Sequence, residues 1–461
     1  MKLAVLGSGP GGYVAAIKAA QLNAEVTVIE DTEVGGTCLN RGCIPTKAML
    51  ASSGLLSKSR ELGAFGIELK GELIPNLAKI VERKNKVVGT QVKGIRGLFK
   101  SWGITLKEGR GVLTSPGEIE VTTKDGSIEK VGADAIIIAT GSRPAQIPIF
   151  PFDGRNILSS TEALELSEIP KSLLIVGAGV IGCEFACLYR ELGTEVTIVE
   201  LLPRAVATED HEISELLERE LKKKKINLIT EIRVARVEIK EDGVHAFLSD
   251  GRELAAEKVL VAIGRTFNSN NMGLESVGVR KGSRGEVLVN NRMETNVPGI
   301  YAVGDVTGGL LLAHMASKEG IVAAKNIMGI STTINYTVVP AAIFTTPEIG
   351  SVGLREYQAA EKGIKYRTGH FQFRGLGKAH AIGEIAGFVK LIAEDSSDRL
   401  IGAHIIGPHA SDLIHEAALA MKAGLTVRDV ADTIHAHPTL AEGVMEAAED
   451  LHGEAIHVPK K

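Results

Sequence analysis

The sequence predicts an α/β protein with two Rossmann-like dinucleotide-binding domains, followed by an α+β C-terminal domain. Three observations predict this fold. A strand–turn–helix–strand pattern over residues 3–30 recurs over residues 173–200, a weaker second repeat follows each copy, and from about Tyr336 short strands are followed by helices. Glycine is also frequent, at 52 of 461 residues, which suits tight turns where the backbone approaches a ligand.

Both copies of the first repeat have the glycine spacing of dinucleotide-binding turns. The glycines are Gly7, Gly9 and Gly12 in the first copy and Gly177, Gly179 and Gly182 in the second. In such turns the first glycine makes the bend, the second lets the backbone approach a pyrophosphate, and the third lets the helix pack against the strand. Glu30 and Glu200 end the second strand of each copy, where an acid accepts hydrogen bonds from a ribose hydroxyl. We therefore expect two bound dinucleotides, or one dinucleotide and a decayed copy of its site.

The second repeat supports a duplication. Residues 133–144 (ADAIIIATGSRP) resemble residues 257–268 (EKVLVAIGRTFN), and each segment lies downstream of one glycine turn. A further strand (GIYAVGD) ends at Asp305, and local sequence leaves open whether this acid binds a polyol or caps a turn. In the last domain, Ser411 and Gly424 are expected to begin and end a helix as N-cap and C′ residue.

Composition and charge exclude several classes of protein. The net charge is −4 and aromatic residues make up 4%, so we expect binding neither to nucleic acid nor to an anionic membrane. No apolar run approaches the ~20 residues of a membrane span, and the N-terminus runs into a glycine turn rather than a signal-peptide cleavage site. Four cysteines are too few for a secreted disulfide scaffold, so the predicted compartment is the cytoplasm.

The segment GGTCLNRGCIPTK, residues 35–47, carries two cysteines shortly after the first glycine turn. Cys38 and Cys43 are separated by four residues, which fits neither zinc knuckles nor thioredoxin motifs. In a regular helix their Cα atoms would be about 8–9 Å apart, too far for a disulfide. A bond between them requires a distorted backbone, for which Gly42 supplies the freedom, and a strained disulfide is the reducible kind. Pro45 suits the first turn of a helix, whose N-terminus would lower the pKa of a released thiol.

The alternative for this pair is two buried structural cysteines near a turn. Its position between two cofactor-binding stretches favours the redox interpretation. For Cys183 and Cys187 we adopt the structural explanation, because they lie one helical turn apart inside the helix of the second copy, where small core residues are expected.

A second group of candidate catalytic residues lies in the segment HAHPTLAEG, near the C-terminus. Pro438 disfavours helical conformation at His437, and the spacing of Thr439 and Glu442 is that of a capping box opening the last helix. Glu442 thus has a structural explanation, but a histidine before a helix with a carboxylate in its first turn is also a base with its orienting group. Local sequence does not choose between His435 and His437. Neither has metal-like partners at helical spacing, so no metal site is predicted.

Taken together, GGTCLNRGCIPTK, both glycine turns, ATGSRP, AVGD and HPTLAE resemble the FAD-dependent pyridine nucleotide–disulfide oxidoreductases, in family order and over almost the whole chain. Within this family the resemblance is closest to members that oxidise dihydrolipoyl groups. Glu200 lacks the basic cluster expected of an NADP-binding glutathione reductase, and residues 313–320 (AHMASKEG) resemble the dihydrolipoyl-oxidising form of the flavin-ring helix. The absence of a C-terminal cysteine pair weighs against mercuric and thioredoxin reductases. Arg41 departs from the apolar residue expected between the cysteines.

The resemblance implies which residues form the site. For FAD it implies Gly7, Gly9, Gly12, Glu30, Thr37, Lys47, Gly111, Thr140, Gly141, Asp305 and Ala313. For NAD it implies Gly177, Gly179, Val180, Ile181, Gly182, Glu200, Val234 and Gly264. Glu184 resembles the glutamate that pairs with Lys47 beside the flavin. The implied catalytic residues are Cys38, Cys43, His437 and Glu442.

The domains that the resemblance implies are an FAD-binding domain over residues 1–145, an NAD-binding domain over 146–265, a central domain over 266–335 that completes the FAD site, and an interface domain over 336–461. The implied activity is oxidation of protein-bound dihydrolipoamide to lipoamide through a redox-active disulfide and FAD, with reduction of NAD to NADH.

The implied partners are a second copy of the chain and the lipoyl-bearing proteins of a larger assembly. The assembly would be a 2-oxoacid dehydrogenase complex, with its lipoyl domains and core acyltransferase, or the glycine cleavage system, with its lipoyl protein. In the homodimer, His437 of each chain would serve the disulfide of the other. Two alternatives are a related reductase for another disulfide, such as glutathione, and a non-catalytic subunit that keeps FAD as a scaffold.

Overall fold

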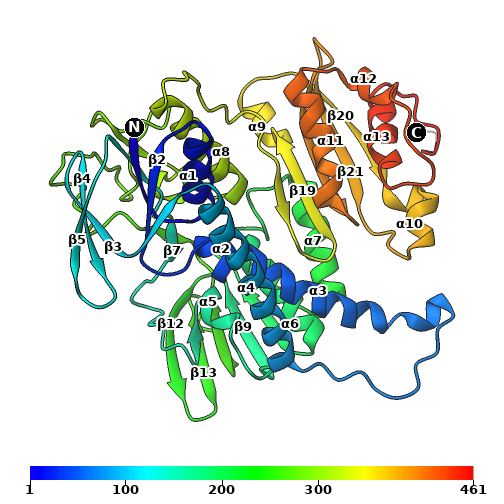
Figure 1. Ribbon diagram of the computed structural model, residues 1–461. Helices are drawn as coiled ribbons and strands as arrows, with labels where there is room; N and C mark the ends of the chain where they lie inside the picture. Colours follow the sequence, from blue (N-terminus) through cyan, green and yellow to red (C-terminus); the bar gives the residue numbers. More distant parts are fainter. Residues whose placement is uncertain (460–461) are drawn as a thin grey trace.

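The computed structural model describes residues 1–459 and contains three main sheets, each with its own helices (Figure 1). The first sheet has seven strands in the order β17-β6-β1-β2-β3-β4-β5. These strands are β1 (Lys2–Leu6), β2 (Glu25–Glu30), β3 (Thr105–Ser115), β4 (Glu118–Thr123), β5 (Ile128–Gly132), β6 (Ala135–Ile138) and β17 (Ile300–Ala302). The five strands from β17 to β3 are parallel, and β3, β4 and β5 form an antiparallel meander.

The second sheet repeats the core of the first. Its five strands, in the order β11-β10-β9-β15-β8, are all parallel. They are β8 (Ile157–Leu158), β9 (Ser172–Val176), β10 (Glu195–Val199), β11 (Asn227–Ile229) and β15 (Lys258–Val261). A separate antiparallel meander consists of β12 (Val234–Lys240), β13 (Gly243–Leu248) and β14 (Glu253–Ala256). The helices of this region are α5 (Ser160–Ala163), α6 (Val180–Leu192) and α7 (His211–Lys223).

The repeat predicted from the sequence is confirmed in register as well as in topology. Helix α1 (Pro10–Gln21) connects β1 to β2 as α6 connects β9 to β10. Lys2 pairs with Glu25, and Ser172 pairs with Glu195, so the partners are 23 residues apart in both copies. The second predicted repeat joins the two copies, because β7 (Ser142–Pro144) pairs with β16 (Arg265–Phe267) in a two-stranded antiparallel sheet.

The third sheet forms the α+β C-terminal region, as expected. Its order is β18-β19-β22-β21-β20, and every neighbouring pair is antiparallel. The strands are β18 (Ala341–Ile343), β19 (Glu348–Gly353), β20 (Tyr366–Gln372), β21 (Phe388–Glu394) and β22 (Leu400–Gly407). The helices are α9 (Glu356–Glu361), α10 (Gly377–Ala381), α11 (Ala410–Ala423), α12 (Val427–Ala431) and α13 (Glu442–Leu451). This region also contains the 3₁₀ turn η3 (Phe373–Gly375), whereas the 3₁₀ turn η1 (Leu62–Phe65) lies in the N-terminal part of the chain.

Two local expectations in this region are wrong. The N-cap of α11 is His409, with φ +56°, rather than Ser411, whose hydroxyl instead donates to Glu348 on β19 at 2.7 Å. Gly424 does end this helix in the left-handed conformation. Helix α13 begins at Glu442 rather than near Thr439, because the Thr439 hydroxyl donates to the carbonyl of Ala436 and only the Glu442 half of the capping box forms.

The remaining helices lie where the three regions meet. Helix α2 (Gly36–Arg41) is followed at once by α3 (Cys43–Ser59), which extends beyond the body of the molecule, and α4 (Leu77–Ser101) returns beside it (Figure 1). On the other side, the 3₁₀ turn η2 (Gly304–Thr307) precedes α8 (Ala313–Ile327). Helix α8 packs tightly on α1: a Cβ at Gly320 would lie 2.4 Å from the carbonyl oxygen of Gly11.

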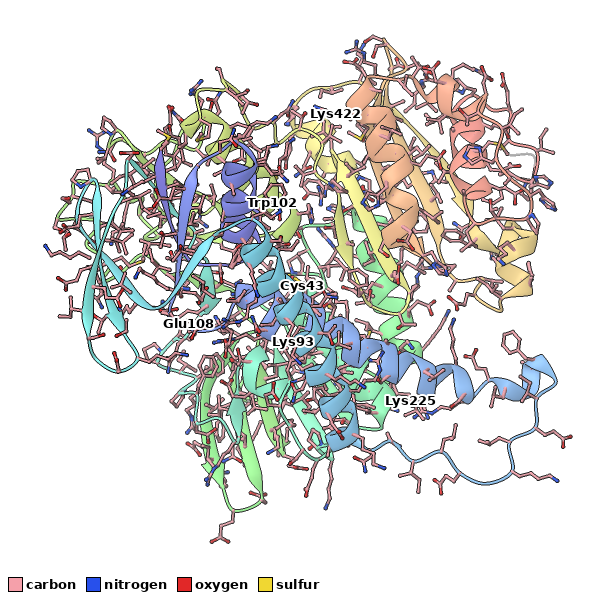
Figure 2. The ribbon with its side chains drawn as sticks, in the orientation of Figure 1. Cys43, Lys93, Trp102, Glu108, Lys225 and Lys422 are labelled. Carbon is pink, nitrogen blue, oxygen red and sulfur yellow. The ribbon has the colours of Figure 1, made fainter. Side chains whose placement is uncertain are left out.

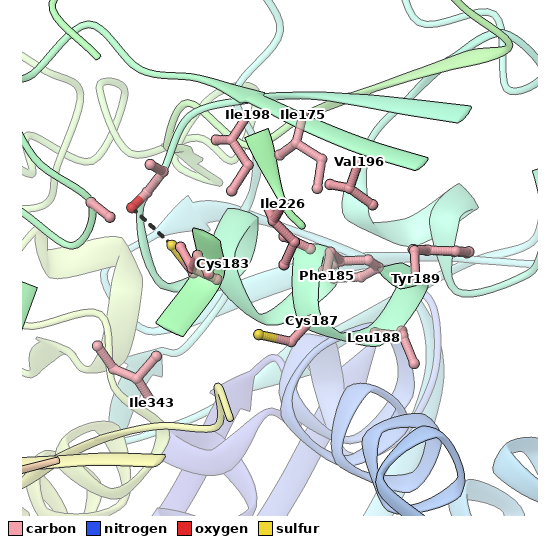
Figure 3. Packing of buried hydrophobic residues seen from close by; sticks show 14 of the residues in the cluster. Ile175, Cys183, Phe185, Cys187, Leu188, Tyr189, Val196, Ile198, Ile226 and Ile343 are labelled. Carbon is pink, nitrogen blue, oxygen red and sulfur yellow. Dashed lines mark hydrogen bonds between the residues drawn. The ribbon is translucent and has the colours of Figure 1, made fainter. Parts of the chain in front are cut away.

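The core of the second region contains the two structural cysteines. Cys183 and Cys187 are fully buried on α6 among apolar side chains that include Phe185 and Tyr189 (Figure 3). Burial raises the pKa of Cys187 to about 12, so this thiol stays neutral. The structural interpretation of this pair is confirmed. No helix within residues 1–459 is long and apolar enough to cross a membrane.

A buried cluster of charges connects the second and third regions. Lys390 on β21 is 1% exposed and lies against three carboxylates. Its Nζ is 2.9 Å from Asp210 and 2.6 Å from Glu212, both at the start of α7, and 2.5 Å from Glu356 on α9. Because a buried ammonium needs such partners, this cluster fixes the second region against the third.

Candidate active site

The two glycine turns have the geometry of dinucleotide cradles. Gly7 and Gly177 have φ of +96° and +104°, and a Cβ at either would lie within 2.5 Å of the carbonyl oxygen that directly follows the neighbouring strand, that of Ala139 after β6 or Ala262 after β15. A Cβ at Gly12 or Gly182 would meet the carbonyl of the first glycine of its own turn, at 2.0 and 1.9 Å. The first and third glycines therefore serve the turn itself.

The middle glycines face open space instead. A Cβ at Gly9 would meet one atom within 4 Å, at 3.9 Å, and a Cβ at Gly179 would meet none. Each lies directly before a helix N-terminus, α1 or α6, whose backbone N–H groups have no partner within the helix. The residues present therefore fit a pyrophosphate at both turns, which is the group that the sequence predicts there.

The acids at the strand ends lie beside these turns. Glu30 is buried and accepts backbone N–H bonds from Ser8 at 2.8 Å and Thr32 at 2.9 Å. Glu200 accepts from the N–H of Ala178 at 2.5 Å and of Leu202 at 2.7 Å. Both carboxylates are thus held as hydrogen-bond acceptors at the end of the central strand pair, as a ribose diol requires.

A third acid belongs to the first cradle. Asp305, in η2, accepts a hydrogen bond from the hydroxyl of Ser142 and lies 3.6 Å from the guanidinium of Arg265. Arg265 also donates to the hydroxyl and carbonyl oxygens of Ser142, at 2.6 and 2.9 Å. The Thr37 hydroxyl donates to the same carbonyl at 3.4 Å. Sequence reasoning missed Ser142 and Arg265, although both lie in the second repeat, directly after Gly141 and Gly264.

The other expected cofactor residues lie around these turns, and several of them would contribute backbone rather than a side chain. Gly141 and Gly264 have positive φ and open space at Cβ, and Thr140 donates to the carbonyl of Asn268 at 2.7 Å. Ala313 is the first residue of α8 and Val180 the first of α6. The remaining three contribute buried or partly buried positions: Gly111 on β3, Val234 at the start of β12, and Ile181 on α6.

The redox candidates lie at the break between two helices, near the middle of the molecule (Figure 2). Cys38 is in α2 and Cys43 is the first residue of α3, with Gly42 between the helices. A Cβ at Gly42 would lie 3.0 Å from the carbonyl oxygen of Thr37, so a side chain would be crowded where the chain bends back. Both cysteines are free thiols, and each is the largest influence on the pKa of the other. The distorted backbone that a Cys38–Cys43 bond requires is therefore present.

The two thiols differ in acidity. The hydrogen bond from Cys38 lowers the pKa of Cys43 to about 7, burial opposes this, and the ammonium of Lys47 adds to the lowering. The same hydrogen bond, together with burial, raises the pKa of Cys38. In the dithiol form a single negative charge is therefore centred on Cys43, at the N-terminus of α3.

Lys47 is held in place by a nearly buried acid of the second region. Its Nζ lies 2.8 and 2.9 Å from the two carboxylate oxygens of Glu184, on α6, and 4.6 Å from the centre of the Phe344 ring. Glu184 also accepts the backbone N–H of Phe344 at 2.9 Å. This pair links the cysteine helix to the second glycine helix, because Glu184 follows Gly182 by two residues.

The histidines near the C-terminus have different environments. His437 Nδ1 lies 2.8 Å from Glu442 Oε1, and the His437 side chain is 77% exposed. Within residues 1–459, no hydrogen bond engages its Nε2. His435 is 6% exposed, and both its ring nitrogens are engaged, by Glu416 at 2.7 Å and by the carbonyl of Thr433 at 2.8 Å. His437 is therefore the histidine that can exchange a proton with a ligand.

Glu442 has both of the roles that the sequence left open. Its Oε2 accepts the backbone N–H of Thr439 at 2.8 Å, while Oε1 binds His437. Burial raises the pKa of Glu442, but these two hydrogen bonds outweigh it and lower the pKa overall. An ionised carboxylate on Nδ1 orients the ring and leaves Nε2 free to face a ligand.

The cysteines and His437 do not meet within one chain. Helices α2 and α13 lie well apart in Figure 1, and no hydrogen bond within residues 1–459 joins either cysteine to His437. Likewise, no group of three or more His, Cys, Asp or Glu side chains in the described part of the chain could hold a metal ion.

Two dinucleotide cradles around a reactive cysteine pair define an oxidoreductase that moves electrons between a nucleotide and a disulfide. Residues 1–320 match the family model for pyridine nucleotide-disulphide oxidoreductases, and residues 339–448 match the dimerisation domain of the same family. The chain belongs to this family, whose cofactors are FAD and NAD.

Relatives and solved structures agree over nearly the full length. A dihydrolipoyl dehydrogenase of Chlamydia pneumoniae is 43% identical and covers 99% of this chain and 98% of its own. The dihydrolipoyl dehydrogenase of Thermus scotoductus is 42% identical with the same coverage. The structure of LpdA from Mycobacterium tuberculosis has a TM-score of 0.93 at 32% identity, over 98% of this chain and 99% of that one. RclA from Escherichia coli, an HOCl-induced flavoprotein disulfide reductase, has a TM-score of 0.87 at 25% identity, over 97% and 99%.

Proposed function

We propose that this chain oxidises protein-bound dihydrolipoyl groups to the lipoyl disulfide and reduces NAD to NADH. The observation that carries the proposal is the cysteine pair at the Gly42 break, with a lowered pKa at Cys43 and Lys47 beside it. Relatives named dihydrolipoyl dehydrogenase, at 42–43% identity over nearly the whole chain, support this substrate class.

The cofactor assignments follow the two cradles. We assign FAD binding to residues 1–145, completed by residues 266–335, because β17 and Asp305 of the latter join the first sheet and the first turn. We assign NAD binding to residues 146–265, and pairing with a second copy to residues 336–461. Bound FAD and NAD would supply the hydride chemistry that reoxidises the cysteine dithiol.

The residues of the chain itself perform thiol–disulfide exchange. His437 accepts a proton at Nε2 from a dihydrolipoyl thiol while Glu442 holds its Nδ1. The resulting thiolate attacks Cys38 in the Cys38–Cys43 disulfide, and Cys43 leaves as a thiolate, stabilised by Lys47. The second substrate thiol then displaces Cys38, which leaves with the proton of that thiol. The lipoyl group departs as a disulfide, and the enzyme holds the Cys38 thiol, the Cys43 thiolate and the proton on His437.

We further propose that each active site is shared by two chains, because the cysteines and His437 lie apart in one chain and a dimerisation domain is present. Mixing inactive Cys38→Ala and His437→Ala dimers under subunit exchange tests this directly. One site of each heterodimer then combines intact Cys38 with intact His437, and activity returns. Persistent inactivity despite demonstrated exchange would refute the shared site.

The partners beyond the second copy follow from the substrate. We propose that the chain serves the lipoyl domains and core acyltransferase of a 2-oxoacid dehydrogenase complex, or the lipoyl protein of the glycine cleavage system. The cytoplasm remains the predicted compartment, and relatives include a mitochondrial enzyme from Pisum sativum. No role in nucleic-acid or membrane binding is proposed.

The test of the substrate is a comparison of kcat/KM for dihydrolipoamide with NAD against that for glutathione disulfide with NADH, on the same FAD-loaded preparation. The proposal expects a large preference for dihydrolipoamide. A preference for the other disulfide would favour the alternative reductase, to which the similarity with RclA points. No turnover with either would favour a non-catalytic subunit.

A further inference from the structure

Glu319 is a buried carboxylate that the proposed mechanism does not use. It lies on α8 and is 2% exposed. Its Oε2 accepts the backbone N–H of Gly304 at 2.7 Å, and its Oε1 accepts the hydroxyl of Tyr336 at 2.9 Å. Each oxygen of this buried carboxylate thus has a hydrogen-bond donor, and a buried carboxylate without donors would be strongly unfavourable.

The group on Oε2 belongs to the turn that presents Asp305. Gly304 has φ +76° and directly precedes Asp305, where the chain leaves β17 and enters η2. A Cβ at Gly304 would lie 3.2 Å from the Cβ of Ala316, which is one helical turn before Glu319 on α8. Glu319 and Ala316 thus fix the Gly304 peptide from the same face of one helix, and its direction sets where Asp305 points.

The donor to Oε1 is the hydroxyl of Tyr336, which follows α8 in the chain. Tyr336 lies on the segment that leads from α8 into β18 and the dimerisation domain. Further along this segment, the backbone N–H of Phe344 donates to Glu184, the partner of Lys47. The segment therefore contacts the first cradle through Glu319 and the cysteine helix through Glu184.

The charge on Glu319 depends on these two donors. Burial raises the pKa of Glu319, the hydrogen bonds from Gly304 and Tyr336 oppose that rise, and the charge of nearby Asp305 adds to it. Removal of either donor leaves the carboxylate less satisfied in a site that already disfavours its charge.

We propose that Glu319 and Tyr336 form a positioning pair for FAD. Glu319 holds the Gly304–Asp305 turn so that the Asp305 carboxylate faces the polyol chain of the flavin nucleotide, and Tyr336 ties this turn to the segment entering the dimerisation domain. Neither side chain touches a reacting atom. This inference rests on the FAD site assigned above.

The experiment measures the affinity of the flavin-free protein for FAD, by quenching of flavin fluorescence on titration. Glu319→Gln replaces one of the two acceptor oxygens by an amide NH2 group, so one buried donor loses its acceptor and the other loses a charged partner. The Kd for FAD is expected to rise about tenfold or more. Tyr336→Phe removes one donor and is expected to raise the Kd by roughly two- to fivefold.

Tyr366→Phe is the matched control. Its hydroxyl donates to Glu356 at 3.1 Å, so it belongs to a second tyrosine–glutamate pair, on β20 and α9 of the C-terminal region. This variant is expected to bind FAD as the wild type does. Thermal unfolding of each flavin-free protein separates a loss of FAD affinity from a general loss of stability.

The outcomes distinguish this inference from the proposed function. Failure of the wild-type chain to bind FAD would overturn the FAD site, and the positioning pair with it. Native FAD affinity in both Glu319→Gln and Tyr336→Phe would overturn the positioning pair while leaving the FAD site intact. An equal loss in all three variants would also overturn it. If Glu319→Gln does not fold, Tyr336→Phe decides: weakened FAD binding with unchanged unfolding of the flavin-free protein supports the pair, and native binding contradicts it.

Discussion

In the first cradle, Gly11 lies beneath Val303 and Ala316, so that a Cβ there would be 3.0 Å from one and 3.3 Å from the carbonyl oxygen of the other. The matching residue of the second cradle is Ile181, and its neighbour Val180 is 41% exposed. The segment that includes β17 and α8 covers the first turn, whereas within residues 1–459 the second turn is more open.

The acids beside the two glycine turns, Glu30 and Glu200, also differ in the number of hydrogen bonds that they accept. Glu30 accepts four hydrogen bonds, from the backbone N–H and the hydroxyl of both Ser8 and Thr32. Glu200 accepts two, both from backbone N–H groups. The first site is thus covered and its acid is held by more hydrogen bonds, whereas the second site is more open. We expect the first to retain its nucleotide and the second to exchange it.

The largest expected effect is a loss of activity that leaves both nucleotide-binding turns unchanged. Cys43→Ser removes the thiol that carries the charge of the dithiol, so oxidation of dihydrolipoamide should be abolished. FAD should stay bound, because the first turn and Glu30 are unchanged. Steady-state assays and the flavin absorbance of the purified variant check both parts. Near-native oxidation by this variant would mean that the disulfide mechanism is wrong.

Exchanging the residues at the matching positions 11 and 181 tests whether the two turns differ in how closely other segments pack on them. Gly11→Ile introduces the residue found at the matching position of the second cradle, where its side chain would collide with Val303 and Ala316. Overpacking of this kind costs about 1–3 kcal/mol. We expect this protein to be purified with little FAD, while Ile181→Gly keeps its FAD. The ratio of flavin to protein absorbance measures both, and an equal FAD content in the two variants would contradict the comparison.

The open cradle should also decide which nucleotide is used. We expect the Glu200 carboxylate to repel the 2′-phosphate of NADP and to accept hydrogen bonds from the ribose of NAD. Glu200→Gln should therefore raise the ratio of kcat/KM for NADP to that for NAD by about tenfold, which corresponds to ~1.4 kcal/mol. Glu195→Gln, at the exposed start of the strand that precedes Glu200, is the control, since it should leave this ratio unchanged. An unchanged ratio in Glu200→Gln would remove this residue from nucleotide selection.

The smallest expected effect concerns how the second cradle's region is attached to the third. A hydrogen bond from His370 and the ammonium of Lys390 lower the pKa of Glu212 to about 2, despite partial burial. Because this folded-state pKa lies below the unfolded value of about 4.3, Glu212 stabilises the fold above that pH and loses its contribution as pH falls towards 2.

Glu212→Gln should therefore flatten the dependence of thermal unfolding on pH between about 4.3 and 2. Glu215→Gln, an exposed neighbour on α7, is the control and should keep the wild-type slope. A wild-type slope in Glu212→Gln would show that this carboxylate contributes nothing to the attachment.

The fold was largely predictable from the sequence because it is encoded locally. Each glycine turn, its two strands and its acid fall within about 30 residues, and the register of β1–β2 and β9–β10 follows from that spacing. Two predictions were wrong. A tertiary contact explains the one at Ser411, and a local turn explains the one at Thr439. Glu348, from a distant strand, binds the Ser411 hydroxyl, and the turn before Glu442 draws the Thr439 hydroxyl to Ala436.

The site was predictable in its motifs but not in its contacts. The Ser142–Asp305 hydrogen bond spans 163 residues and the contact of Arg265 with Ser142 spans 123, so no local pattern could predict them. The choice between His435 and His437 also depended on a tertiary contact, since Glu416 on α11 engages His435. Resemblance to a family suggested the pairing of Lys47 with Glu184, which the structure contains.

The most direct test of electron transfer from the cysteine pair is an anaerobic titration of the FAD-loaded protein with dihydrolipoamide, followed by visible absorbance. The proposed function predicts a long-wavelength charge-transfer band from a Cys43 thiolate against the flavin, which appears in the wild-type chain and is absent in Cys43→Ser. Flavin reduction without such a band, or no spectral change at all, would contradict the assignment of Cys38 and Cys43 as the redox centre.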